Sequence, residues 1–86
     1  MASVQVLYFA WLRERAGRSQ ETVALPDGVA TVGGLVAHLA GLDEAHASAF
    51  AHAGLVRAAV NQEFASPGDP VAGGDEVAFF PPVTGG

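Results

Sequence analysis

Several short segments of the chain place apolar residues at every second position, which is the pattern of a half-buried β-strand. In the first of them, Val4, Val6 and Tyr8 share one side, while Gln5 marks the other. Five segments with strand character are bounded by turn-forming residues: Ser3–Phe9, Glu21–Leu25, Leu55–Val60, Glu63–Ala65 and Glu76–Phe80. We therefore expect five short strands, with a tight turn at Asn61-Gln62.

A helical repeat of apolar residues begins after Thr31, a residue type that commonly caps helices. The repeat consists of Val32, Leu35, Val36 and Leu39. It predicts the main helix of the protein, ending near Ala40 before a glycine. Two shorter helices are expected at Ala10–Ala16 and Glu44–Ala53, and each is followed by a glycine that suits a helix end.

The order of these elements is strand, helix, strand, two helices, strand, short strand and strand. A sheet with one main helix across it is an α+β arrangement, and this order resembles the β-grasp, or ubiquitin-like, fold. In that fold the first and last strands lie side by side and parallel at the centre of a mixed sheet. The resemblance predicts one domain over residues 1–80, followed by an extended C-terminal tail over residues 81–86.

Alternation also predicts which aromatic residues stay outside the core. Phe9, Phe64 and Phe80 each share the parity of a polar residue in or next to their own strand. Residues of the opposite parity account for the core, namely Val4, Val6, Tyr8, Val77 and Phe79. Three aromatic side chains on the solvent side predict an exposed apolar patch, which is typical of an interaction site. The alternative is a second small cluster covered by the first helix or by a loop, for example through Trp11 and Leu12.

The composition of the chain excludes several kinds of functional site. There is no cysteine, which excludes disulfides, thiolate metal sites and cysteine nucleophiles. There is no lysine either, and four arginines against nine acids give a net charge of −5, so we expect no nucleic-acid-binding surface. The sequence shows no secretory signal and no membrane-spanning run, and the expected compartment is the cytoplasm. His38, His46 and His52 show no metal spacing and are expected at the surface.

The chain closes with the residues Pro81-Pro82-Val83-Thr84-Gly85-Gly86. Prolines end a strand because they have no N–H to donate, and they favour an extended arm. At about 3.1 Å per residue, such an arm would hold the terminal carboxylate roughly 18 Å from the sheet. Because glycine has no Cβ, it passes where other residues would clash. We therefore expect the tail to deliver its carboxylate into the active site of another protein.

Several of these segments together resemble the sulfur carrier subunits of molybdopterin synthase. They are Val60-Asn61-Gln62, the stretch Gly74 to Gly86 with its Phe-Phe-Pro-Pro and Gly-Gly motifs, and Leu12-Arg13-Glu14 with Gly17. The similarity spans the whole chain in element order and length, and the last thirteen residues are the most specific part.

The resemblance implies a mechanism. An E1-like activating enzyme adenylates Gly86 with ATP and magnesium, and a persulfide donor then converts the adenylate into a thiocarboxylate. Within a heterotetramer the tail enters the large catalytic subunit, where it gives its sulfur to a pterin precursor in molybdenum cofactor biosynthesis. The active site is expected mainly on that subunit, and no cofactor, metal, nucleic acid or membrane is expected to bind this chain.

The resemblance also implies roles for single residues. Gly86 carries the adenylate and the sulfur, and Gly85 keeps the passage narrow. The arm consists of Pro81, Pro82, Val83 and Thr84. The docking positions on the large subunit are Phe9, Phe64 and Phe80.

Two alternatives stay open. A related carrier could serve thiazole synthesis, tRNA thiolation or conjugation to protein lysines, although thiazole carriers tend to be shorter and to lack the Phe-Phe-Pro-Pro ending. A non-catalytic β-grasp interaction module would have an inert tail and no reactive group at Gly86.

Overall fold

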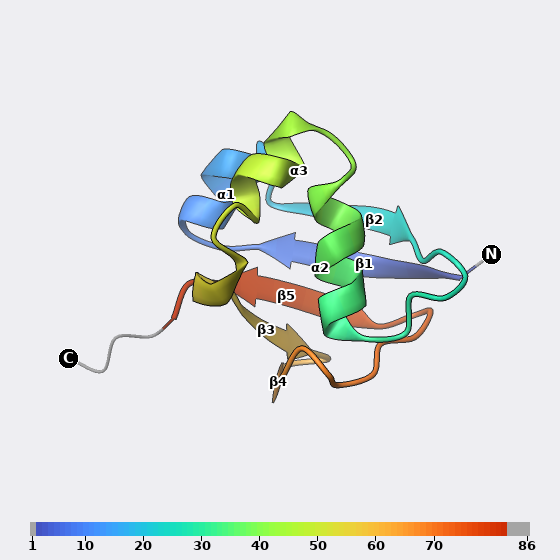
Figure 1. Cartoon of the computed structure of the whole chain (residues 1–86). Coiled ribbons are helices and arrows are strands. Elements are labelled where there is room, and N and C mark those ends of the chain that lie inside the picture. The colour runs from blue at the N-terminus through green and yellow to red at the C-terminus, as the bar shows by residue number, and fades with distance from the viewer. Residues whose placement is uncertain (1, 83–86) are drawn as a thin grey trace.

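Five strands form one mixed sheet in the order β2-β1-β5-β3-β4 (Figure 1). The computed structural model describes residues 2–82 of the chain. The strands are β1 (Ser3–Tyr8), β2 (Gln20–Ala24), β3 (Arg57–Val60), β4 (Glu63–Ala65) and β5 (Glu76–Phe80). β1 and β5 run parallel, and the other neighbours are antiparallel. The first and last strands are therefore adjacent inside the sheet, which confirms the expected α+β, β-grasp arrangement.

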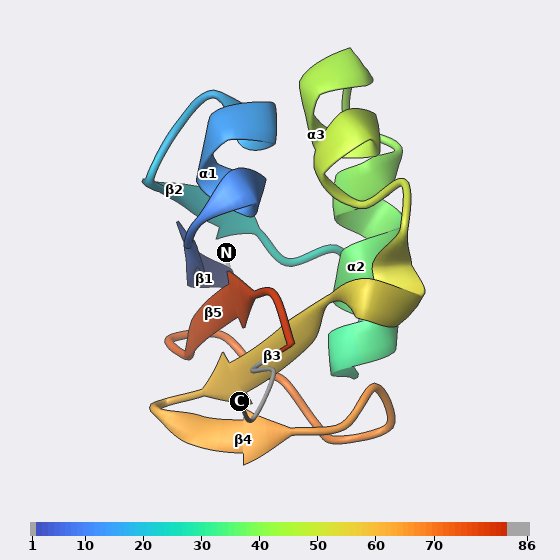
Figure 2. The ribbon, with the colours of Figure 1, turned by 90° about the vertical axis from the view of Figure 1, so that its left-hand side faces the viewer.

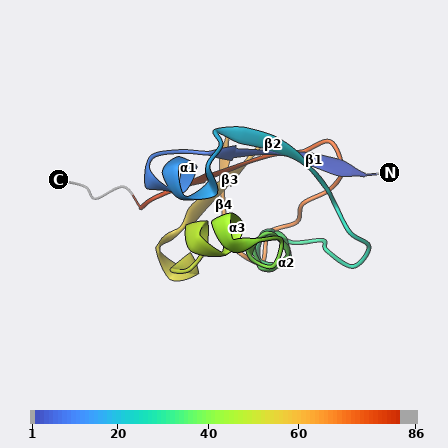
Figure 3. The same cartoon turned by 90° about the horizontal axis from the view of Figure 1, so that it is seen from above.

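The helices gather on one face of this sheet (Figures 2 and 3). They are α1 (Trp11–Ala16), α2 (Val32–Ala40), α3 (Glu44–Ala49) and a 3₁₀ turn, η1 (Ala53–Leu55). α2 is the main helix and crosses the sheet, while α1 packs chiefly against α3. Within residues 2–82 no helix lies on the other face, so that face of the sheet is open to solvent.

Local chemistry sets the helix ends. The hydroxyl of Thr31 accepts a hydrogen bond from the Gly34 N–H at 3.1 Å, so Thr31 caps α2 as predicted. Gly17 ends α1 with a φ of 75°, a conformation that suits glycine. Asp43 caps α3 by accepting from the His46 N–H at 2.9 Å. The three helices are thus specified largely by residues beside them in the sequence.

Two predicted boundaries are wrong. The helix expected over residues 44–53 ends at Ala49, and the strand expected from Leu55 begins at Arg57. The interval contains η1, in which the Leu55 N–H donates to the His52 carbonyl at 2.8 Å. Leu55 is 54% exposed, so an apolar residue that suggests a buried strand lies outside the core. The other element boundaries agree with the sequence prediction within one residue.

The core lies between the sheet and the helices, and strand alternation predicts it correctly. The inward residues of β1 and β5 are at most 1% exposed, namely Val4, Val6, Tyr8, Val77 and Phe79. Leu12 of α1 and Leu35 and Leu39 of α2 are fully buried in the same cluster. The rings of Phe50 and Phe79 meet edge to face with centroids 5.1 Å apart. The helix-side face of the central strands β1 and β5 is therefore filled by the core.

A tight hairpin turn joins β3 to β4, as predicted. Asn61 and Gln62 have φ values of 51° and 71°, the left-handed pair that a two-residue hairpin turn requires. The Asn61 amide also donates to Asp75 at 3.0 Å and accepts from the Glu76 N–H at 3.0 Å. The turn is thereby fixed to the start of β5, the strand that leads to the tail.

Candidate functional site

The open face of the sheet carries a strip of apolar side chains across four strands. The register pairs Leu7 of β1 with Ala78 of β5. Ala78 pairs in turn with Ala59 of β3, and Ala59 pairs with Phe64 of β4. Because directly opposed residues point to the same face of a sheet, these four side chains form one continuous strip.

Three phenylalanines extend this strip toward the end of β5. Phe64 is 83% exposed, and its ring packs on that of Phe80 with centroids 5.9 Å apart. Phe9 is 48% exposed and follows β1 at the position beside Phe80 in the parallel register. We call Phe9, Phe64 and Phe80 the aromatic patch. The predicted exposure is confirmed for Phe9 and Phe64, whereas Phe80 is half-buried.

The first helix does not cover the aromatic patch. Leu12 is fully buried in the core, and Trp11 packs against the edge of that core. The guanidinium of Arg15 lies 4.7 Å from the Trp11 ring centroid and so occupies its outer surface. The alternative in which Trp11 and Leu12 shield the three phenylalanines is therefore wrong.

The root of the tail lies beside the same patch. The Phe9 N–H donates to the Phe79 carbonyl at 3.1 Å, which ties the end of β1 to the end of β5. Phe80 is the last residue of β5, and the half-buried Pro81 and Pro82 follow it outside the strand. The remaining predicted tail positions lie outside the described residues: Val83, Thr84, Gly85 and Gly86.

A buried polar cluster joins β1, β2 and α3, and the sequence pattern does not predict it. His46 is 2% exposed, with Nε2 lying 2.7 Å from Oε2 of Glu21 and Nδ1 2.7 Å from Oδ1 of Asp43. The Tyr8 hydroxyl donates to Oε2 of Glu21 at 2.6 Å, and Arg18 donates to Oε1 at 3.0 Å. The expectation of a surface imidazole is therefore wrong for His46.

The pKa values in this cluster shift for identifiable reasons. Burial disfavours the His46 imidazolium, but hydrogen bonds with Glu21 and Asp43 outweigh it and raise the pKa of the ring. Burial also disfavours the Glu21 carboxylate, but hydrogen bonds from Tyr8 and His46 outweigh it and lower the pKa of Glu21. Burial, reinforced by the bond to Glu21, raises the pKa of Tyr8. Every buried side-chain polar atom in residues 2–82 has a hydrogen-bond partner, so the cluster has a structural role. We call this cluster of Tyr8, Arg18, Glu21, Asp43 and His46 the polar clasp.

Two features are absent from the part of the chain that the structure describes. There, no three side chains of the metal-binding types gather closely enough to hold an ion. Nor does any helix there combine the length and apolarity that crossing a bilayer requires. What the described residues do present is an exposed apolar patch at the end of β5, the last strand.

The parallel central strands, the single crossing helix and the tail root at the end of β5 define a ubiquitin-like β-grasp protein. The chain belongs to the ThiS family, whose sequence profile matches residues 6–86. It is 45% identical to the molybdopterin synthase sulfur carrier subunit of Escherichia coli (strain K12), a match that covers 96% of this chain and 99% of that relative. Its identity to the carrier subunit of Haemophilus influenzae is 40%, with the same coverage of both chains.

Solved structures share this fold. Small archaeal modifier protein 1 of Haloferax volcanii is 35% identical and superimposes with a TM-score of 0.78, covering 96% of this chain and all of that one. A chain from the complex of subunits 1 and 2 of the molybdopterin-converting factor of Helicobacter pylori has a TM-score of 0.62. At 20% identity, this second likeness concerns the fold alone.

Proposed function

We propose that this chain is the sulfur carrier subunit of a molybdopterin synthase and acts in molybdenum cofactor biosynthesis. The observation that carries the proposal is similarity over the whole length to relatives of that name, at 45% identity with 99% of the relative covered. A family match alone would leave the client of the carrier open. Full-length similarity to carriers of one named enzyme favours that enzyme as the client.

The proposal divides the chain into a β-grasp domain, residues 1–80, and a delivery arm, residues 81–86. In its support, β5 ends at Phe80, is paired on both edges, and is followed by two residues that cannot continue the ladder. A strand held on both sides is a rigid base for an arm. Pro81 to Thr84 would form the arm, Gly85 would pass the narrow channel, and Gly86 would carry the reactive group.

The proposed chemistry needs no side chain of this protein. A carboxylate is a poor electrophile because its charge repels nucleophiles, so an E1-like enzyme joins Gly86 to AMP from ATP–magnesium and releases pyrophosphate. The outer sulfur of the persulfide displaces AMP and forms an acyl disulfide with Gly86. A second thiol of the partner enzymes then attacks the donor cysteine sulfur, which releases the thiocarboxylate on Gly86 and leaves a disulfide on the partner. The chain binds no cofactor of its own in this scheme, and the use of ATP favours the cytoplasm as its compartment.

The aromatic patch supplies the proposed docking surface for the large catalytic subunit. Exposed aromatic side chains are uncommon on a surface that faces only water, and they are enriched where proteins bind each other. The patch lies beside the tail root, so a partner that covers Phe64 and Phe80 would also receive the arm that starts at Pro81. Docking of the large subunit on the aromatic patch would then also place the arm for delivery of Gly86.

Reconstitution tests the proposal. The chain is charged with its activating enzyme, ATP and a persulfide donor, and is then mixed with the large subunit and the pterin precursor. We expect two charged carriers to be consumed for each dithiolene product, because the product contains two sulfur atoms. A chain that lacks Gly86 should still bind the large subunit and yield no product. Full activity without Gly86 would instead support an inert tail.

A second candidate function is protein modification. The observation that favours it is the structural match, at 35% identity, to a protein named as a small archaeal modifier. A modifier would form an amide between Gly86 and a lysine of another protein. Denaturing electrophoresis of cell extracts that contain the tagged chain would show discrete, Gly86-dependent conjugates in that case. For a dedicated sulfur carrier we expect the free chain alone.

A further inference from the structure

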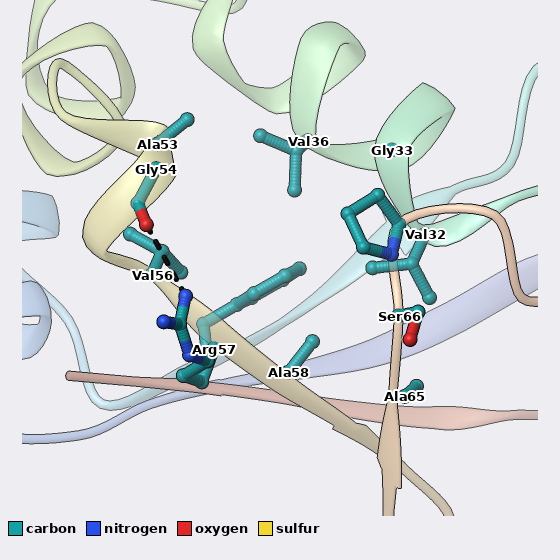
Figure 4. Close-up of a pocket in the computed structure, with 12 residues that line it drawn as sticks. Val32, Gly33, Val36, Ala53, Gly54, Val56, Arg57, Ala58, Ala65 and Ser66 are labelled. Carbon is teal, nitrogen blue, oxygen red and sulfur yellow. Dashed lines mark hydrogen bonds between the residues drawn. The ribbon is translucent and has the colours of Figure 1, made fainter. Parts of the chain in front are cut away.

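A pocket of about 480 Å³ opens on the helix side of the sheet (Figure 4). The start of α2 lines it on one side, η1 and the start of β3 line it on another, and the loop after β4 closes it. Its size falls within the range of small-molecule sites, roughly 300–1,000 Å³. The carrier function proposed above leaves this pocket without a role.

The walls of the pocket are apolar and built from small residues. Val32 and Val36 of α2 face Val56 and Ala58 across the opening, and the fully buried Phe79 contributes to the lining. A side chain at Gly33, also in the wall, would place its Cβ 3.1 Å from the Pro67 carbonyl oxygen. Such walls bind an aliphatic or aromatic group by removing its surface from water.

The backbone at the start of α2 offers nothing to an anion. The Val32 N–H donates to Asp69 at 3.0 Å, and the Gly33 N–H donates to Pro67 at 2.8 Å. The Gly34 N–H donates to the Thr31 hydroxyl. The donors that usually make a helix start attractive to phosphate are therefore occupied.

Arg57 is the charged residue of the pocket lining. Its guanidinium donates to the Gly54 carbonyl at 3.2 Å, which holds the side chain along one wall (Figure 4). Within residues 2–82, no carboxylate lies within ion-pair distance of Arg57, whereas Arg18 pairs with Glu21 at 3.0 Å. An exposed cation fixed beside an apolar pocket, in a chain of net charge −5, is complementary to an apolar molecule with one negative charge.

We propose that this pocket binds a small monocarboxylate, with its aliphatic or aromatic body between α2 and β3 and its carboxylate on Arg57. The planar guanidinium matches a carboxylate through two parallel N–H donors. A phosphate dianion would need more donors than this one side chain supplies. The pocket lining includes none of the three phenylalanines of the aromatic patch, although Arg57 lies opposite Phe80 in the register of β3 and β5. Ligand binding to the isolated chain can therefore be tested without the carrier function.

The test is a titration of the ¹⁵N-labelled full chain with 3-phenylpropionate, monitored by amide chemical shifts. We expect saturable shifts at Gly33, Gly54 and Ser66, with a dissociation constant on the order of millimolar, as for a fragment of this size. The neutral 3-phenylpropionamide has the same shape without the charge. It should bind about tenfold more weakly, because the charge-assisted hydrogen bond is lost.

Variants distinguish binding in the pocket from a general effect of the protein's charge on anion binding. Arg57→Gln should reduce the affinity for the acid to that for the amide, while Arg13→Gln, the same charge change on the exposed side of α1, should leave it unchanged. Ala65→Leu fills the pocket and should abolish both affinities. Equal binding of acid and amide, equal effects of the two arginine variants, or shifts confined to other surfaces would each overturn the proposal. The proposal would also be overturned if the pocket amides shifted on addition of the large subunit but not of the acid. The pocket would then bind a side chain of that partner.

Discussion

Nε2 of His46 lies 2.7 Å from Oε2 of Glu21, and this contact joins α3 to the edge strand β2 across 25 positions of sequence. The other ring nitrogen lies 2.7 Å from a carboxylate oxygen of Asp43. Carboxylates only accept hydrogen bonds, so both ring nitrogens must carry protons to satisfy both contacts. The geometry therefore requires an imidazolium, in agreement with the raised pKa of His46.

The pH dependence of stability follows from this clasp. The pKa of His46 is raised above its usual 6.5, so its contribution is complete below pH 6.5 and is lost as the pH rises through the raised value. The pKa of Glu21 is lowered from 4.5, so its contribution is complete above pH 4.5 and is lost as the pH falls through the lowered value.

Urea unfolding midpoints should accordingly be highest between about pH 4.5 and 6.5 and should fall on both sides. His46→Gln should remove the decline on the alkaline side, while His52→Gln, at an exposed position, should keep it. A wild-type midpoint that does not change from pH 6 to 9 would mean that His46 carries no stabilising charge.

The hydroxyl of Tyr8 should contribute measurably to the same clasp. Tyr8→Phe keeps the buried ring but removes the donor to Glu21, and it should cost about 1–2 kcal/mol of unfolding free energy. It should also raise the pKa of Glu21, so that stability is lost at a higher pH on the acid side. Thr22→Val is the matched control, because it removes an exposed hydroxyl that bonds Gln5 and should cost less than about 0.5 kcal/mol.

The link between β1 and α1 stores backbone strain. Ala10 has φ 56° and ψ −134°, a region that glycine occupies freely and residues with a Cβ avoid. Ala10→Gly should therefore stabilise the protein by about 1 kcal/mol in thermal or urea unfolding. Ala47→Gly, on the exposed face of α3, should destabilise it by about as much. If both substitutions lower stability equally, Ala10 is not strained in solution.

Phe64 should matter for binding and hardly for folding. Phe64→Asp places a charge at a position that is 83% exposed, so the free energy of unfolding should change by less than about 1 kcal/mol. Under the proposed function the same change should weaken binding to the large subunit by at least about 30-fold in calorimetry, since a desolvated aromatic contact is replaced by a charge. Phe80→Asp, beside it at the tail root, should behave alike.

The control for Phe64→Asp and Phe80→Asp is a substitution on the helix side of the sheet. Ala47→Asp adds the same charge on α3 and should leave binding to the large subunit unchanged. Unfolding caused by Phe80→Asp would contradict its assignment to the solvent side of β5. Unaltered binding in both phenylalanine variants would move the docking surface elsewhere.

The sequence predicts most of the fold because the decisive signals are local. Strand parity separates Val77 and Phe79, which are fully buried, from the more exposed Phe80, and the Thr31 cap starts α2 at the expected residue. The tight turn at Asn61-Gln62 is likewise visible in the residue types.

The errors concern contacts between distant segments. The burial of His46 depends on Glu21, which belongs to another element. The sequence does contain a signal for the burial of His46. Asp43 caps α3, and His46 shares one helix face with the apolar residues Ala49 and Phe50. Leu55 suggested a strand because it is apolar, but η1 turns it outward. The apolar pocket with Arg57 at its wall likewise needs three segments to meet, and no local pattern predicts it.

The proposed function requires that the carboxylate of Gly86 can be converted to a thiocarboxylate. Intact-protein mass spectrometry after incubation with the activating enzyme, ATP and a persulfide donor tests it most directly. We expect a mass gain that corresponds to one oxygen replaced by one sulfur, located on the C-terminal peptide and absent without ATP. An unchanged mass, with Gly86 intact and an activating enzyme that charges another carrier in parallel, would contradict it.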